Sequence, residues 1–418
     1  MTPEVKQRIE QIQQGIVPKG YKKTKTDIVP ADWKESPIGK YIREYTEKTT
    51  IPNQYPVLTS ARTGLMLQTD YYSNRQVTTE DNVGYNVLPY GYITFRSRSD
   101  DGRFRFNENR IIERGVISYF YPVFSFSEEV CHEYMLYLLN FSIYRRMYPY
   151  AEGTAQQVLS LKKLGQLKYS LPLVAEQKKI AEILATQDKA IELQERKIDE
   201  LKRFKKGCLE RMFPRKGQKV PEKRFPGFTD DWERRKVGDI TIESTEYLTL
   251  DSGLPLFTSS RNGLLYQNEY RGNVTTNNKQ TLFSVVPLGA CTYRHMSDDD
   301  VFHLNINTIE KGLVSREYPV FCGTPNHDIV FIVQHINSSK AFRAFCAEQK
   351  MGGTRTRLYY KALCEFTMMV PSFAEQRRIS KFLLTIDHLI TLHQRKLEEM
   401  KKQKKALMQL LLTGIVRV

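Results

Sequence analysis

The sequence predicts an α+β protein in which two similar globular segments are joined by two long helices that pair antiparallel as a coiled coil. Three observations predict this arrangement: a tandem duplication, a heptad pattern at the end of each copy, and strand and turn residues elsewhere in each copy. An antiparallel helix pair would relate the two segments by a pseudo-twofold axis. The chain has 418 residues, which is enough for two or three domains with cores of their own.

The duplication repeats the same motifs at an offset that stays between 197 and 200 residues. "DWKESPIG" at 32–39 returns as "DWERRKVG" at 231–238, and these motifs hold the only two tryptophans. The sixteen residues from Pro56, "PVLTSARTGLMLQTDY", match those from Pro255, "PLFTSSRNGLLYQNEY", at eight positions. One match could be chance, but several matches in register indicate that the two halves share one fold.

Each copy is predicted to contain a mixed segment followed by a charged helix. The mixed segments are rich in Thr, Val, Tyr and Phe and are interrupted by Gly and Pro, which predicts short strands and turns with a helix near 128–146. The predicted divisions are an N-terminal helical segment, a first mixed segment, a first long helix, an exposed linker rich in Pro, Gly and basic residues, a second mixed segment and a second long helix. Their bounds are 1–20, 21–170, 171–213, 214–230, 231–370 and 371–418.

Both predicted helices open with the same motif and carry the same seam. "LPLVAEQKKIAEIL" (171–184) and "VPSFAEQRRISKFL" (370–383) share a proline, a Glu-Gln pair and an isoleucine, and apolar residues then recur at alternating steps of four and three. Pairing would bury the two seams, which are roughly 55 Å long for 37 residues; the alternative is that each helix packs on its own domain. The predicted structural and partner-binding helix residues are Glu176, Gln177, Ile180, Leu184, Ile191, Ile198, Leu201, Glu375, Gln376, Ile379, Leu383, Ile390, Leu397 and Met400.

The charge balance favours a polyanionic partner. The chain holds 63 Lys and Arg against 47 Asp and Glu, for a net charge of +16 and a pI near 9.4. Such a surplus favours nucleic acid over a membrane surface, and simple solubility is the alternative explanation.

The six cysteines show neither C-x-x-C pairs nor a disulfide framework, so we expect reduced thiols in a cytoplasmic protein. No apolar run approaches the roughly 18 residues of a membrane span. The first residues, "MTPEVKQRIEQIQQ", are polar, so neither a signal peptide nor a membrane helix is expected.

Sequence signatures of common catalytic sites are absent. There is no G-x-x-x-x-G-K-[ST], G-x-G-x-x-G or H-E-x-x-H motif, and no Pro-Pro dipeptide of an adenine methyltransferase loop. The best acidic clusters, Asp100-Asp101 and Asp298-Asp299-Asp300, are expected to be solvated turns. A loop that accepts a hydrogen bond from cytosine N4, or a metal site, is the alternative for them. No catalytic residue and no metal ligand are therefore predicted.

The candidate DNA contacts lie in loops that match between the two copies. Gly64 and Gly263 permit tight turns that push Arg62 and Arg261 outward. "FRSRSDDGRFRF" (95–106) alternates arginines with aromatic residues, which predicts a hairpin with its bases on one face. Arg would contact phosphates, and Arg, Asn, Gln and Ser would read base edges, although any one arginine could be an ordinary surface charge. The predicted DNA-binding residues are Ser60, Arg62, Gln68, Arg96, Arg98, Arg103, Arg105, Gln156, Ser259, Arg261, Asn262, Gln267, Arg294, His295, Arg355 and Arg357.

Together these motifs resemble the specificity subunit of type I restriction–modification systems. The resemblance rests on the Trp-Gly segment, on "G-x-x-S-x-x-Y-x-V-F" at 115–124 and 312–321, and on the "P-x-x-x-EQ-x-x-I" helix. In both helices an aspartate, Asp188 or Asp387, follows the Gln by eleven residues. The resemblance covers nearly the whole chain.

The resemblance implies two target recognition domains joined by two helical conserved regions, without catalytic activity. It implies binding to double-stranded DNA at a bipartite site, two modification subunits that methylate adenine, and restriction subunits that complete the nuclease. S-adenosylmethionine, ATP and Mg²⁺ would then lie on those partners and no cofactor on this chain.

Two other functions stay open at this point. One is a stand-alone nucleic-acid-processing enzyme that uses the Asp-Asp loops, and the other is a purely structural coiled-coil scaffold. Helices that hold the readers roughly 50 Å apart would separate the half-sites by about 15 base pairs. Because the two mixed segments are similar but not identical, we expect related, non-identical half-sites.

Overall fold

The computed structural model describes residues 2–25, 27–72, 81–147, 157–271, 280–350 and 355–418, with only the backbone described at 142–147 and 271. Its contacts divide the chain into two units. Unit 1 comprises residues 1–194 and 396–418, and unit 2 comprises residues 195–395. Each unit therefore contains one copy of the mixed segment, the first part of one long helix and the last part of the other.

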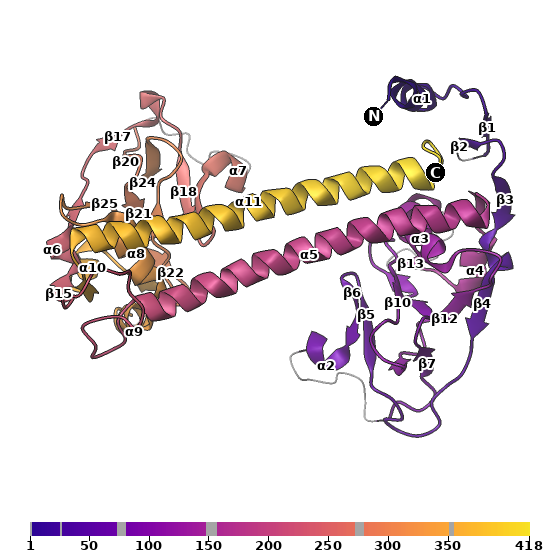
Figure 1. Cartoon of the computed structure of the whole chain (residues 1–418), viewed down its shortest axis with the longest axis horizontal. Coiled ribbons are helices and arrows are strands. Elements are labelled where there is room, and N and C mark those ends of the chain that lie inside the picture. Colours follow the sequence, from indigo (N-terminus) through magenta and orange to yellow (C-terminus); the bar gives the residue numbers. More distant parts are fainter. Residues whose placement is uncertain (1, 26, 73–80, 148–156, 272–279, 351–354) are drawn as a thin grey trace. The chain divides into compact units, whose positions relative to one another are not determined.

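Unit 1 mixes short strands with a few helices, as the sequence predicts (Figure 1). Its helices are α1 (Pro3–Gln13), α2 (Gln68–Tyr71), α3 (His132–Met147), α4 (Leu161–Gln166) and the first part of α5 (Val174–Met212). Its strands are β1 (Tyr21–Lys23), β2 (Ile28–Pro30), β3 (Lys34–Pro37), β4 (Ile42–Tyr45), β5 (Leu58–Ala61), β6 (Gly64–Leu67), β7 (Asn86–Pro89), β8 (Ile93–Phe95), β9 (Arg98–Ser99), β10 (Phe106–Glu108), β11 (Arg114–Ile117), β12 (Val123–Phe126), β13 (Gln157–Val158) and β14 (Lys168–Leu171).

Unit 2 repeats this plan. Its helices are α6 (Val237–Ile240), α7 (Gln267–Arg271), α8 (Ile329–Ser338), α9 (Lys340–Glu348), α10 (Tyr360–Cys364) and the first part of α11 (Phe373–Leu412). Its strands are β15 (Glu233–Lys236), β16 (Thr241–Glu243), β17 (Tyr247–Leu248), β18 (Phe257–Ser260), β19 (Gly263–Tyr266), β20 (Phe283–Val286), β21 (Cys291–Thr292), β22 (Met296–Ser297), β23 (Asn305–Ile306), β24 (Gly312–Ser315), β25 (Val320–Gly323), β26 (Thr356–Arg357) and β27 (Thr367–Val370).

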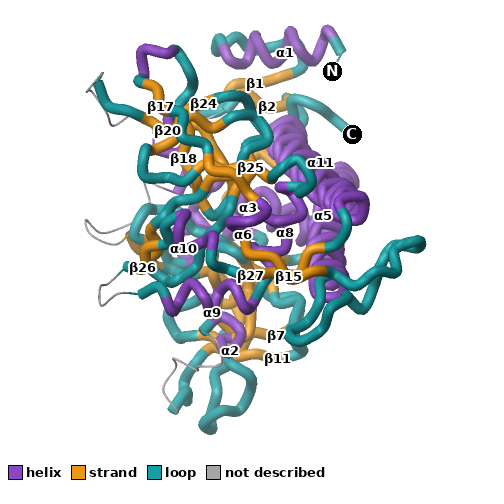
Figure 2. Tube along the Cα trace, turned by 90° about the vertical axis from the view of Figure 1, so that its left-hand side faces the viewer, coloured by secondary structure: helices purple, strands orange, loops and turns teal. Residues whose placement is uncertain are grey.

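The strand order confirms that the two mixed segments share one fold. Unit 1 has an antiparallel sheet in the order β10-β8-β12-β4, and unit 2 has its counterpart in the order β23-β21-β25-β16. The smaller ladders correspond as well: β3–β14 with β15–β27, β5–β6 with β18–β19, and β9–β13 with β22–β26. Figure 2 shows these strands and the helices by type.

Each sheet packs its apolar side chains against helices. In unit 1, Phe95, Phe106 and Phe124 are buried and form a cluster with α3 and with the start of α5. In unit 2, Phe321 and Phe331 are buried in the cluster that also contains the end of α5 and the start of α11. Burial of such aromatic side chains is a major stabilising contribution to the fold. In each unit, apolar side chains of the long helices therefore belong to the same hydrophobic core as those of the mixed segment.

The long helices α5 and α11 are continuous over 39 and 40 residues. They start at Val174 and Phe373, two residues after the prolines of the repeated motif, as predicted. The seam residues Ile180, Leu184, Ile379 and Leu383 are buried, whereas Glu182 and Lys381 between them are exposed.

The two helices pair antiparallel within each unit, which confirms that prediction (Figures 1 and 2). In unit 1 the start of α5 shares a cluster with Leu411 and Leu412 at the end of α11. In unit 2 the end of α5, at Cys208 and Met212, shares a cluster with the start of α11. Each helix also packs on its neighbouring mixed segment, so the pairing of the helices and the packing of each helix on a mixed segment both occur.

The segment between the halves is less exposed than predicted. Pro221 is buried, and Val220 and Phe225 pack against the core of unit 2. Arg224 forms a largely buried ion pair with Glu375. The reason is that three apolar side chains of this basic stretch find apolar neighbours, which composition alone could not indicate.

All six cysteines are free thiols, and Cys131, Cys208, Cys291 and Cys346 are buried. Among the described residues, no helix has the length and apolar character that a membrane span needs.

Candidate nucleic-acid interface and helix anchors

Each unit presents an arginine at the tip of a two-residue hairpin. In unit 1, Ala61 pairs with Gly64 across the β5–β6 turn, so Arg62 occupies the tip. In unit 2, Ser260 pairs with Gly263 across the β18–β19 turn, so Arg261 occupies the tip. The two glycines have φ of +137° and +117°, a region that other residues avoid. The predicted turns are confirmed, and both arginine side chains are exposed.

An asparagine of the central sheet holds each hairpin by hydrogen bonds. The Asn107 amide on β10 donates to the Ser60 hydroxyl over 2.8 Å and to the Ala61 carbonyl over 2.9 Å. Asn305 on β23 donates in the same way to Ser259 and to the Ser260 carbonyl, both over 2.8 Å. Ser60 and Ser259, predicted as DNA contacts, are thus buried in the hairpin base, where their hydroxyls are already bonded.

Each hairpin arginine is ion-paired with an aspartate of the acidic loop after β9 or β22. Arg62 Nη2 lies 2.6 Å from Asp101 Oδ1, and Arg261 Nη2 lies 2.6 Å from Asp299 Oδ2. Asp101 also accepts from the Ser99 hydroxyl and the Arg103 amide, and Asp299 accepts from the Ser297 hydroxyl. The Ser297 hydrogen bond and Arg261 outweigh partial desolvation and lower the pKa of Asp299. The sequence predicts turns for these aspartates but does not predict their arginine partners.

The arginines of the 95–106 segment alternate with buried aromatic side chains, as predicted. Phe95, Phe104 and Phe106 point into the core. β8 and β10 pair antiparallel, and the segment between them carries exposed side chains at Arg96, Arg98, Arg103 and Arg105. The Arg98 guanidinium lies 4.6 Å from the centre of the Phe120 ring.

The corresponding segment of unit 2 differs in chemistry. Arg294 is exposed, but His295 is buried and stacks on Tyr359. Burial lowers the pKa of His295, which favours its neutral form at pH 7. Arg355 Nε lies 2.7 Å from Asp298 Oδ1, and Arg357 is exposed on β26.

The remaining predicted contacts are less informative. Gln68 and Gln267 are half-buried at the starts of α2 and α7, and Asn262 is exposed beside Arg261. Gln156 lies outside the described residues.

A surface pocket occurs at the same place in both units, beside β9 or β22. The pocket in unit 2 has a volume of about 490 Å³ and includes His295, Arg316, Arg357 and Tyr359 in its wall. Its counterpart in unit 1, about 380 Å³, has Ser97, Tyr119 and Phe120 in its wall. The wall in unit 2 carries Arg316, Arg357 and Lys361 against Glu243 and Glu317, whereas the wall in unit 1 carries Lys48 against Glu44.

The Glu-Gln motif anchors each long helix. In unit 1, Gln177 donates to the Pro172 carbonyl and accepts from the Cys131 amide, over 2.9 and 2.8 Å. In unit 2, Gln376 donates to the Pro371 carbonyl and accepts from the Asp328 amide, both over 2.9 Å. Each glutamine therefore ties the start of a long helix to the backbone that precedes α3 or α8.

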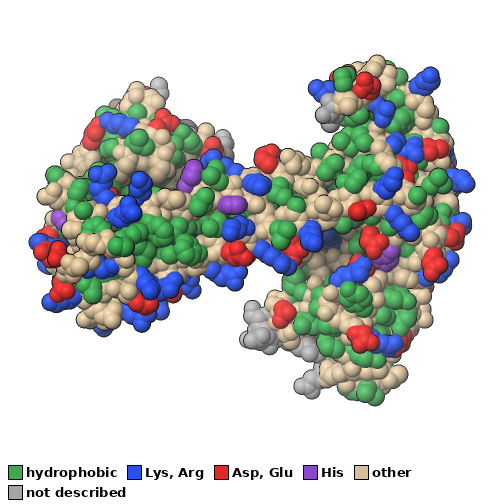
Figure 3. Space-filling view, in the orientation of Figure 1, with side chains coloured by type: hydrophobic (Ala, Val, Ile, Leu, Met, Phe, Trp, Pro, Cys, Tyr) green, Lys and Arg blue, Asp and Glu red, His purple; other side chains and the backbone are tan. Residues whose placement is uncertain are grey.

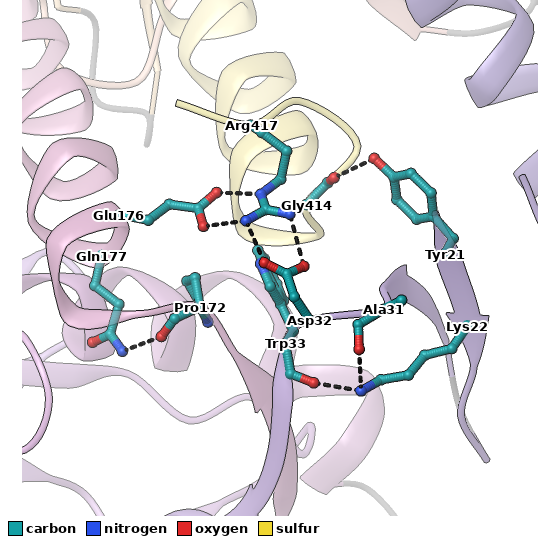
Figure 4. Close-up of polar contacts among 10 residues, drawn as sticks. All are labelled: Tyr21, Lys22, Ala31, Asp32, Trp33, Pro172, Glu176, Gln177, Gly414 and Arg417. Atoms are coloured by element: carbon teal, nitrogen blue, oxygen red, sulfur yellow. Dashed lines mark hydrogen bonds and ion pairs between the residues drawn. The ribbon is translucent and has the colours of Figure 1, made fainter. Parts of the chain in front are cut away.

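The glutamate of the motif binds an arginine that follows the other long helix. Arg417, after α11, contacts both Glu176 oxygens over 2.6 and 2.8 Å and both Asp32 oxygens over 2.9 Å (Figure 4). Glu176 and then Asp32 raise the pKa of Arg417. Arg224, after α5, contacts both Glu375 oxygens over 2.8 and 2.6 Å. Arg224 and Arg417 are not related by the repeat offset, so the duplication does not predict them.

Two lysines that interrupt the apolar seams have partners. Lys205 lies 2.7 Å from Asp387, and Lys404 is ion-paired with Asp188. Tyr137 of α3 also donates to Asp188 over 2.7 Å, and Gln334 of α8 donates to Asp387 over 3.2 Å. These two polar interruptions of the seam are therefore paired across the two helices.

Within the part of the chain that the structure describes, no group of three or more His, Cys, Asp or Glu side chains is arranged to hold a metal ion. In unit 2 the three aspartates of the acidic cluster have basic or hydroxyl partners instead, namely Arg355, Arg261, Lys350 and Thr356.

Comparison with known proteins gives one consistent family. The type I restriction modification DNA specificity domain matches residues 23–203 and 315–402. A Methanocaldococcus jannaschii protein described as the MjaX specificity subunit of a type I restriction enzyme is 26% identical over 307 residues, 68% of each chain. The MjaVIII specificity subunit of the same organism is 23% identical over 290 residues, which are 64% of this chain and 66% of that protein.

Solved structures share the fold. The S subunit of a type I restriction–modification system from M. genitalium has a TM-score of 0.58 at 13% identity, covering 95% of this chain and 99% of that one. A chain from a study of complex assembly and conformational transition of the type I R-M system has a TM-score of 0.52 at 14% identity, covering 93% and 99%. These comparisons give no support to a stand-alone nucleic-acid-processing enzyme. The chain belongs to the type I restriction–modification DNA specificity family and is a non-catalytic specificity subunit.

Proposed function

We propose that this specificity subunit recognises a bipartite DNA target, with unit 1 reading one half-site and unit 2 the other. The observation that carries the proposal is the repeated hairpin, which presents Arg62 or Arg261 at the same register position of the same fold. The residues around the two tips differ, so the half-sites would be related but not identical. Base pairs between them would be unread.

The predicted DNA contacts divide into two groups by their surroundings. Arg62, Arg261 and Asn262 lie at hairpin tips, from which side chains can enter a groove and read base edges. The exposed arginines at positions 96, 98, 103, 105 and 294 suit phosphate contacts, which supply affinity without sequence information. The buried Ser60 and Ser259 suit a supporting role beneath the tips.

The proposed target recognition domains are residues 21–170 and 231–370, and the helical conserved regions are 171–213 and 371–418. The ladders β3–β14 and β15–β27 support this division, because they close each mixed segment just before a long helix. Residues 1–20 and 214–230 precede the two domains.

We infer that the helices hold two modification subunits, which methylate adenine with S-adenosylmethionine. Restriction subunits that use ATP and Mg²⁺ would join them. Leu193 and Leu392, related by the repeat, are 55% and 44% exposed on α5 and α11. Figure 3 shows further hydrophobic side chains along the helical part of unit 2, where Phe204, Leu384 and Leu389 are exposed. Native mass spectrometry of Leu193→Asp and Leu392→Asp complexes would show the loss of one modification subunit from each.

Methylome sequencing of the host, with and without this gene, tests the proposed function. We expect one bipartite motif with methylated adenines to disappear when the gene is removed and to return with it. A continuous motif, or methylation that does not depend on the gene, would contradict the proposal.

A further inference from the structure

We propose that Asp101 and Asp299 are positioning residues that hold Arg62 and Arg261 in the orientation that reads a guanine, and that they also suppress binding to unrelated DNA. This inference rests on the proposed function, since it assumes that the hairpin tips enter the DNA grooves. It assigns a specificity role to two acidic residues on a protein whose partner is a polyanion.

In unit 1, contacts at the base and at the tip of the β5–β6 hairpin fix the orientation of Arg62. The base of the β5–β6 hairpin is held by buried Asn107, through the hydroxyl of Ser60 and the carbonyl of Ala61. The tip is held by Asp101, whose Oδ1 lies 2.6 Å from Arg62 Nη2. Asp101 is itself oriented, because the same oxygen accepts from the Ser99 hydroxyl over 3.0 Å and from the Arg103 amide over 3.1 Å.

Unit 2 repeats the asparagine, arginine and serine contacts of this arrangement. Asn305 holds the base of the β18–β19 hairpin, and Asp299 Oδ2 lies 2.6 Å from Arg261 Nη2. Ser297 donates to Asp299 Oδ1 over 2.8 Å, as Ser99 does to Asp101. Arginine and aspartate are 39 residues apart in unit 1 and 38 in unit 2, so the pair is not a product of local chain geometry.

A contribution to folding stability does not explain why these two Arg–Asp ion pairs are present. Both arginine side chains are about two-thirds exposed, at 65% and 66%, and both aspartates are more than 40% exposed. Exposed ion pairs contribute little to folding, because water screens them and the long arginine side chain loses conformational freedom. The same loss of freedom becomes useful when the side chain must later meet a ligand in one orientation.

The hydrogen-bond donors of the arginine at the hairpin tip match the acceptors of guanine. A guanidinium carries five N–H donors and no acceptor, and the aspartate occupies only part of this set. The remaining donors form a planar fork that fits the O6 and N7 acceptors of guanine in the major groove. No other base offers two acceptors at that edge. A fork held in place by a carboxylate would therefore distinguish a G·C pair from the alternatives.

The negative charge of the aspartate has a second effect. A free arginine at an exposed tip would bind any phosphate, which adds affinity for DNA of every sequence. A carboxylate beside it repels phosphates and offsets the arginine charge. Specific binding tolerates the carboxylate because the guanine edge is neutral, so the aspartate should raise the ratio of specific to non-specific affinity.

The test uses the full chain in complex with its modification subunits, after the target has been identified from methylation. The variants are Asp101→Ala, Asp101→Asn, Asp299→Ala and Asp299→Asn. The controls are Glu129→Gln and Glu365→Gln, which remove one charge from the exposed ion pairs with Lys40 and Lys236. Kd would be measured at fixed salt for the target, for duplexes with each base pair replaced in turn, and for an unrelated duplex.

We expect Asp101→Ala to reduce discrimination at one G·C pair of one half-site by at least about fivefold, the lower end of what a bidentate contact contributes. The other half-site should be unaffected, and affinity for unrelated DNA should stay the same or rise. Asp299→Ala should act on the other half-site only. Asp→Asn keeps the acceptor oxygen, so it should retain part of the discrimination.

A double variant tests whether the aspartate acts through the arginine or only through the local structure. In an Arg62→Ala background, Asp101→Ala should leave discrimination unchanged, because the aspartate acts through the arginine. The inference would be overturned if Asp101→Ala or Asp299→Ala changed Kd equally for all replaced base pairs, or did not change it. It would also be overturned if either half-site contained no G·C pair. Failure of the wild-type complex to prefer its target would instead refute the proposed function, and the two failures are therefore distinguishable.

Discussion

Lys205 of α5 donates to both carboxylate oxygens of Asp387 of α11, over 2.7 and 2.8 Å, at a polar position of the helix seam. The repeat relates this pair to Lys404 and Asp188, which are ion-paired in unit 1. Both lysines are less than one-quarter exposed. A polar pair at a seam position fixes the register of paired helices, because any shift would leave a partly buried charge without its partner.

Asp387→Ala should therefore destabilise the protein more than an ordinary surface substitution. We expect the free energy of unfolding to fall by about 2 kcal/mol, the range for a lost hydrogen bond to a charged group. Replacing both partners, Lys205→Leu with Asp387→Leu, should recover most of that loss, because it removes the unpaired charge. Urea denaturation measures both changes.

The matched control is Glu399→Ala, which removes the exposed ion pair with Lys402 on the same helix. Its effect should stay within about 0.5 kcal/mol. An equal loss in Asp387→Ala and Glu399→Ala would contradict a role of Lys205 in fixing the register.

The two helix anchors should differ in strength because their burial differs. The side chains of Glu375 and Arg224 are 1% and 15% exposed, whereas those of Glu176 and Arg417 are 9% and 40% exposed. Arg224→Ala should cost about 3 kcal/mol by leaving a buried carboxylate unpaired, and Arg417→Ala about half as much. Arg→Lys should restore little at either site, since lysine cannot form the two parallel hydrogen bonds. Thermal unfolding of the four variants would rank them; a larger loss for Arg417→Ala would contradict this order.

These contacts show where prediction from sequence succeeds and where it stops. The repeat and the heptads predict two copies of one fold, antiparallel helices and the turn that exposes Arg62, because each depends on local spacing. The pair Lys205–Asp387 spans 182 residues, and Ser60 accepts a hydrogen bond from Asn107, 47 residues away. Local patterns do not contain such contacts. Arg224 and Arg417 are 193 residues apart rather than 199, so the repeat offset that found the other pairs misses this one.

A buried histidine should make unit 2 sensitive to acid. His335 lies in the core, stacked 4.5 Å from Phe213, and burial lowers its pKa to about 4 from an ordinary 6.5. Between pH 4 and pH 6.5, the His335 imidazole binds a proton in the unfolded chain but not in the folded chain. Stability is therefore unaffected above pH 6.5 and falls as the pH drops towards 4, by about 3 kcal/mol in all.

His335→Phe should flatten this part of the pH profile, measured by urea denaturation at several pH values. His388→Gln changes an exposed histidine of α11 and should leave the profile unchanged. A profile that is the same in His335→Phe and the native chain would assign the acid sensitivity to other groups.

The hairpin arginines should act on separate half-sites. Arg62→Ala should lower discrimination in one half-site, and Arg261→Ala in the other, each by about 1–3 kcal/mol at one base pair. Arg43→Ala removes an exposed arginine that donates to the backbone carbonyls of Lys40 and Ile42, and it serves as the control. If the hairpin arginines contact phosphates instead, affinity would fall equally for all sequences and the salt dependence would decrease by about one unit.

The length of the paired helices should set the length of the unread spacer. Lys205 follows Asp188 by 17 residues on α5, and Lys404 follows Asp387 by 17 residues on α11, so one heptad can be removed between them from each helix, at residues 189–195 and 397–403. Deleting both heptads keeps the two Lys–Asp pairs and the alternation of the seams. Each deletion shortens its helix by about 10.5 Å.

At 3.4 Å per base pair, this shortening corresponds to about three base pairs. We expect the shortened protein, assembled with its modification subunits, to methylate targets whose spacer is about three base pairs shorter. A library of duplexes that differ only in spacer length would measure the preference. Deleting residues 189–195 alone should abolish methylation at every spacer length, because it brings Lys205 seven residues out of register with Asp387. An unchanged preference in the double deletion would refute the idea that α5 and α11 set the spacing.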